Sequence, residues 1–115
     1  MNDFYKNLKS FLKELVSLFP DDHEMKVITT SINLAIMEEQ QDIVQRFYNN
    51  LYPLEKFINT RNEQFFRENY WDTSSEEYHL FNKLNELFNF LDQNNKKIFW
   101  DYIQVLYNLS KKEVI

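Results

Sequence analysis

The chain has 115 residues, of which 43% are hydrophobic and 17% aromatic, so it has the apolar material for one folded domain and is not a disordered segment. It contains no cysteine, which excludes disulfides, thiolate nucleophiles and thiolate metal sites. It also contains no glycine, which excludes the glycine-rich loops that bind phosphates and dinucleotides, and its net charge of −5 argues against a general electrostatic attraction to nucleic acid.

The first predicted helix covers residues 3–19 and is amphipathic. Its apolar side chains repeat at helical spacing on one face, while Lys6, Lys9 and Lys13 lie on the other. Pro20 ends it, because a residue before proline avoids the helical region. We interpret this segment as a core helix whose lysines extend to solvent; a helix lying on a membrane surface is the alternative.

The second predicted helix covers residues 23–37. Asp21 and Asp22 supply an N-cap, so we interpret the cluster Asp21–Glu24 as a capping cluster; its spacing lacks a metal-binding pattern. Val27 and Leu34 lie opposite the main apolar stripe of this helix, which consists of Met25, Ile28, Ile32, Ala35 and Ile36.

The sequence pattern in the middle of the chain predicts shorter helices. A third helix covers residues 43–51, and Pro53 opens a short fourth helix that runs through Ile58. We expect residues 62–71 to fold onto the core and residues 72–77 to form a loop and cap. The next helix, to Leu91, has two distinct faces. Leu80, Phe81, Leu84, Leu87, Phe88 and Leu91 are expected inside, and His79, Asn82, Lys83, Asn85, Glu86 and Asn89 outside.

The last predicted helix covers residues 92–109 and has an unusually wide apolar arc, after which residues 110–115 are expected to fray. Without glycine, asparagine is the next best residue for a left-handed helix end. The candidate ends are Asn49, Asn50, Asn59, Asn69 and Asn108. The chain as a whole, residues 1–115, therefore predicts a single all-α domain, a compact bundle of five to six helices.

Candidate functional residues are few. His79 lies on a polar helix face with no sign of an oriented base or oxyanion hole, so we expect no catalytic residue and no enzyme; we also expect no cofactor and no metal. Trp100, Gln104 and Tyr107 form the candidate partner surface on the last helix. The aromatic edge either packs under residues 62–71 or binds a protein partner or a second copy, and we favour the interface. A local patch of Lys96, Lys97, Lys111 and Lys112 is the alternative, as a nucleic-acid contact.

One stretch carries a family resemblance. The run Ile98–Leu106 (IFWDYIQVL) resembles the I-W-x-Y-L-Q-x-L ending of small uncharacterised helical proteins of nucleocytoplasmic large DNA viruses, the giant viruses. The stretches 11–21 and 58–66 are also similar in order. Phe99 and Ile103 depart from the family pattern, in which Ile and Leu stand at these positions; both are swaps that a core tolerates.

This resemblance implies a giant-virus origin, which agrees with the many residues that have AT-rich codons, and it implies no activity. We therefore expect a non-enzymatic viral accessory protein that acts through protein–protein contacts in assembly, the virus factory or host interference. No run of about 18 apolar residues and no secretory leader is present, so we expect no membrane span and a location in the host cytoplasm or the virion.

Overall fold

The structure is a computed structural model, and it describes residues 2–38, 42–63, 65 and 78–114. The described elements are all helices and no strand occurs among them, which confirms the predicted all-α bundle. Most of the segment 62–71 and all of the expected loop 72–77 lie outside the described residues.

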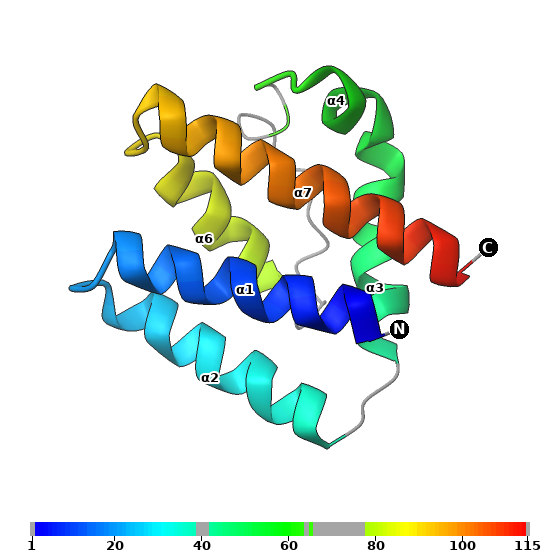
Figure 1. The fold of residues 1–115 in the computed structure, drawn as a ribbon, viewed down its shortest axis with the longest axis horizontal. Coiled ribbons are helices and arrows are strands. Elements are labelled where there is room, and N and C mark those ends of the chain that lie inside the picture. Colours follow the sequence, from blue (N-terminus) through cyan, green and yellow to red (C-terminus); the bar gives the residue numbers. More distant parts are fainter. Residues whose placement is uncertain (1, 39–41, 64, 66–77, 115) are drawn as a thin grey trace.

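Helices α1 (Asn2–Leu18) and α2 (His23–Met37) form a pair joined by a tight turn (Figure 1). Local sequence sets both ends of this turn. Pro20 follows the end of α1, and Asp22 is the N-cap of α2, because the Asp22 Oδ1 accepts a hydrogen bond from the Met25 N–H at 2.9 Å. Helix α1 buries Phe4, Leu8, Phe11, Leu12 and Leu15 in the core. The predicted boundaries of both helices are therefore confirmed to within a residue.

The chain then makes α3 (Asp42–Leu51), a 3-10 turn η1 (Tyr52–Leu54) and the short α4 (Glu55–Thr60). Pro53 lies in the first turn of η1, where its missing N–H costs nothing. Helix α4 is followed directly by its C-cap Arg61, which takes the left-handed conformation with φ 50°.

The asparagine rule for helix ends is wrong here, since Arg61 is the only described residue with positive φ. Asn49 and Asn50 lie within α3, which runs directly into η1, and Asn108 lies inside the last helix. Asn59 lies inside α4, two positions before the C-cap Arg61, and Asn69 lies outside the described residues. The end of α4 is fixed by tertiary contacts of the Arg61 side chain, described below.

Helix α6 (Tyr78–Phe88) confirms its predicted inward face, because all six residues expected inside are buried. Two residues of the predicted outward face are covered: Asn85 is half-buried and Lys83 is buried. Lys83 is only 4% exposed, since the start of α2 covers it.

Helix α7 (Gln93–Val114) packs against α1, α3 and α4 and crosses the bundle from one end to the other (Figure 1). Its buried face is narrower than predicted, and Val105 is exposed. The helix also continues through Val114, so the expectation of a frayed tail is wrong for residues 110–114. The physical reason is that Ser110 is fully buried, its hydroxyl donating to the Tyr107 carbonyl at 2.7 Å.

Candidate binding site

The structure places the predicted aromatic edge of α7 in the core. Trp100 is 5% exposed and Tyr107 1% exposed. The Trp100 ring packs against Phe65 at 5.8 Å and Phe88 at 6.0 Å between ring centroids. The expectation that Trp100 and Tyr107 form an exposed partner surface is therefore wrong. The alternative of packing under residues 62–71 agrees with the contact that Phe65 makes.

Tyr107 is held by a polar network as well as by packing. Its ring stacks on Tyr48, with centroids 5.9 Å apart, and its hydroxyl donates to Glu55 Oε1 at 2.8 Å. Lys111 Nζ reaches the same carboxylate oxygen at 2.8 Å. Burial raises the pKa of Tyr107, and the hydrogen bond to Glu55 raises it further, so the hydroxyl stays protonated as the donor.

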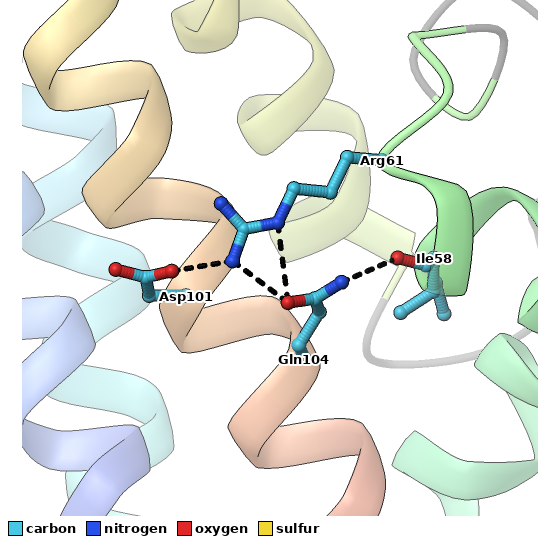
Figure 2. Close-up of polar contacts among 4 residues, drawn as sticks. All are labelled: Ile58, Arg61, Asp101 and Gln104. Carbon is cyan, nitrogen blue, oxygen red and sulfur yellow. Dashed lines mark hydrogen bonds and ion pairs between the residues drawn. The ribbon is translucent and has the colours of Figure 1, made fainter.

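Gln104, the third residue of that predicted surface, links α7 to the end of α4 (Figure 2). Its side-chain Nε2 donates to the Ile58 carbonyl at 3.0 Å, and its Oε1 accepts from Arg61 at 2.7 Å and 3.2 Å. Arg61 also pairs with Asp101. The half-buried Gln104 amide therefore holds the left-handed residue in place.

The four lysines of the alternative nucleic-acid patch do not form one surface. Lys96–Lys97 and Lys111–Lys112 lie near opposite ends of α7, about 22 Å apart at 1.5 Å per residue. Lys96 Nζ lies over the Phe88 ring at 5.0 Å and pairs with Glu63 at 3.9 Å, and Lys111 pairs with Glu55. Two of the four charges are thus already neutralised within the chain.

The capping interpretation of Asp21–Glu24 is confirmed. Asp22 caps α2 with one oxygen, and its other oxygen, Oδ2, pairs with Lys83 Nζ at 2.9 Å. The hydrogen bond from Lys83 lowers the Asp22 pKa, against the effect of burial. In the described part of the chain, no three side chains of His, Asp or Glu gather as they would around a metal ion.

The outer side of α2 presents apolar residues that the bundle does not cover. Val27 is 51% exposed, Leu34 53% and Met37 74%. At helical spacing they lie within an arc of about 80°, which faces away from the buried Met25 and Ile28. We call these three residues the α2 face. The sequence pattern alone predicts that Val27 and Leu34 lie opposite the core stripe.

A pocket of about 350 Å³ adjoins the α2 face on the side of α3 and α6, and we call it the α2 pocket. Its buried wall consists of Leu8, Ile28, Ile43, Phe47 and Leu80, with Ile32 and Ala35 half-buried beside them. Val27 belongs to its edge, together with Ser31 and the polar side chains of Glu24, Arg46 and His79. Four helices contribute, which is why no single stretch of sequence revealed it.

Such a site can bury apolar groups of a ligand or partner. Its volume lies in the range of about 300–1,000 Å³ typical of binding pockets, which combine apolar walls with a few polar groups at the rim. The exposed α2 face continues the apolar surface beyond the pocket. His79, expected on a solvated face, is exposed at this rim.

Comparisons with protein-family models, with curated proteins and with solved structures found no match for this chain. Among the helices that the structure describes, none combines the length and the apolar character needed to cross a membrane.

Proposed function

We propose that this is a non-enzymatic protein that acts through protein–protein contacts, and that the α2 face and the α2 pocket together are its binding surface. The observation that carries the proposal is the apolar pocket that borders the α2 face at exposed Val27, with Leu34 and Met37 exposed further along the same helix. Contiguous exposed apolar surface costs solubility, and on folded proteins it marks binding sites.

The shape of this surface favours a helical partner. The α2 face is a linear strip about 15 Å long between Val27 and Met37, at 1.5 Å per residue. An amphipathic helix binds an apolar surface of this length through apolar side chains spaced three, four and seven residues apart. One anchor would enter the α2 pocket while the others cover Leu34 and Met37.

The proposal includes the setting that the C-terminal motif implies, a giant virus, with a role in assembly, in the virus factory or in host interference. These roles require a partner protein and no chemistry, which agrees with a surface built for apolar burial.

Filling the pocket tests the proposal. Ala35 lines the α2 pocket and is half-buried, so Ala35→Trp should occupy the space that an anchor would enter. Val105→Trp is the matched control, because Val105 is exposed on α7, away from the pocket. Each variant, immobilised after circular dichroism has shown native helicity, would be used to capture proteins from infected host cells.

We expect a protein retained by the wild type and by Val105→Trp to be lost at least tenfold with Ala35→Trp. Equal retention by the filled-pocket variant would contradict the proposal, and so would the absence of any protein specific to the wild type.

A further inference from the structure

A second hollow, of about 500 Å³, adjoins the α2 face on its other side, between α1 and α2. It is lined by Lys9, Lys13 and Val16 of α1 and by Thr29, Asn33 and Met37 of α2. Met37 belongs both to this hollow and to the α2 face, so the two surfaces are continuous. We call this second hollow the basic groove.

The charge of the basic groove is one-sided. Lys9 and Lys13 are exposed and four residues apart, and Lys6 extends the same row, so three ammonium groups lie along one face of α1. Glu14 lies about 100° and 140° round the helix from Lys13 and Lys9. No ion pair of these lysines occurs in the part of the chain that the structure describes.

The row gathers three positive charges on one helix face of a chain that has 18 acidic and 13 basic residues. Buried Lys83 and half-buried Lys96 and Lys111 have carboxylate partners. Lys6, Lys9 and Lys13, like the other exposed lysines, have none among the described residues, and they differ from the others in lying in one row beside a hollow. Their charge is therefore available to a partner molecule.

Two polar atoms on the α2 side of the groove also lack partners. Thr29 Oγ1 and Asn33 Oδ1 are buried and make no hydrogen bond in the described structure. They lie one helical turn apart on the side of α2 that faces Lys9 and Lys13. Unsatisfied buried polar atoms are costly, and a small adjustment on binding would let them meet polar groups of a partner.

The opposite edge of the α2 face has a different charge pattern. There the rim of the α2 pocket carries Glu24 beside Arg46 and His79, so acidic and basic groups are mixed. A helix lying along the α2 face would therefore meet three lysines on its α1 side and a mixed rim on the other side. Complementary charge fixes orientation and speeds association across such a surface.

We propose that the partner is an acidic amphipathic helix, which lies along the α2 face with its row of Asp and Glu side chains over Lys9 and Lys13. The inference rests on the proposed function, and it adds the charge and the orientation of the partner. A membrane surface with anionic lipids would offer negative charge too, but a hollow of about 500 Å³ with polar atoms on its α2 side fits side chains of a helix better than a flat lipid surface.

The test selects binders from a displayed library of amphipathic helices whose flanking positions carry random charge. We expect the helices enriched on the wild-type protein to carry an excess of Asp and Glu on one flank. The charge-reversed variant Lys9→Glu/Lys13→Glu should bind those helices about tenfold more weakly, and the difference should shrink as salt is raised from 50 to 300 mM because exposed charges are screened.

The control is Lys97→Glu/Lys112→Glu, which reverses the same number of exposed lysines on α7 and should leave binding unchanged. Enriched helices without an acidic flank, or equal binding by both charge-reversed variants, would overturn this inference while the proposed function stands, provided that Ala35→Trp abolishes binding. No enrichment at all would overturn both. The protein is tested in the same way for co-sedimentation with phosphatidylserine vesicles. Co-sedimentation that is stronger than helix binding and is lost in Lys9→Glu/Lys13→Glu would overturn the inference and show that the partner is a membrane surface.

Discussion

The burial and the charge of Lys83 depend on contacts between two helices. Its position on α6 is polar by helical phase, yet its ammonium group is buried and lies 2.9 Å from Asp22, 3.5 Å from Glu86 and 3.9 Å from Glu24. Burial alone would lower the pKa of Lys83, but the hydrogen bond and charge of Asp22, together with the charges of Glu86 and Glu24, outweigh burial, and the pKa is raised. The lysine therefore remains charged and joins α6 to the beginning of α2.

Asp22→Asn separates the charge of Asp22 from its capping role, because the asparagine oxygen still caps α2. Loss of the charged hydrogen bond should lower the free energy of unfolding by about 2 kcal/mol at pH 7. Since the folded-state pKa of Asp22 is lowered, its contribution is complete above its ordinary value of 3.8 and is lost as pH falls through the lowered value. Urea unfolding from pH 7 to pH 2 should therefore show a smaller loss of stability for Asp22→Asn than for the wild type.

Lys83→Met provides the control for this pair. In the Asp22→Asn background it should cost less than in the wild type, because the main partner of the ammonium group is already gone. Parallel pH curves for the wild type and Asp22→Asn, or fully additive costs, would show that the pair contributes nothing to stability.

At the scale of the element, α7 has a buried face and an exposed face, and both carry apolar residues. The wide apolar arc in the sequence therefore does not show which of these residues are buried. Trp100→Ala should destabilise the protein by about 3–5 kcal/mol, since a buried aromatic ring leaves a cavity between Phe65 and Phe88. Val105→Ala, on the exposed face, should change stability by less than about 0.5 kcal/mol. Chemical denaturation followed by far-UV circular dichroism measures both.

If Trp100→Ala retained wild-type stability and instead altered the mass of the protein in solution, the ring would be part of an interface, and its place in the core would be contradicted.

The helices differ in how far local sequence determines them. Residues 23–37 were predicted to the residue because Asp22 and the spacing of the apolar stripe are local signals. The end of α7 was missed because Ser110 is buried by other helices and Lys111 pairs with Glu55, both of them tertiary effects. The left-handed C-cap at Arg61 could not be predicted for the same reason, since Gln104 and Asp101 on α7 hold the Arg61 side chain.

The candidate site was predicted only in part. Val27 and Leu34 stood out as apolar residues on the wrong side of a helix, a signal visible without a structure. The pocket beside them requires Ile43 of α3 and Leu80 of α6 to meet Ile28, and no periodicity within one helix indicates such a meeting. The width of an apolar arc does not reveal how many neighbours cover it, so the sequence alone does not distinguish a buried Trp100 from an exposed one.

At the scale of the whole molecule, one core joins the described helices, from Phe4 in α1 to Tyr107 in α7. We expect thermal unfolding in a single cooperative step, with coincident far-UV and near-UV circular dichroism curves. Addition of a chelator should leave the midpoint unchanged, because Asp22 serves as cap and ion-pair partner. A separate early loss of the near-UV signal would contradict a single core.

The position of α7 in the chain has a consequence for biosynthesis. Helices α1, α3 and α4 precede α7, yet their apolar faces pack against it. At about 5–20 residues per second, a ribosome needs roughly 3 to 11 s to pass from the end of α4 to the end of α7. Throughout that interval the nascent chain carries uncovered Phe and Leu side chains, so we expect chaperones that shield these side chains until α7 emerges to raise the yield of folded protein.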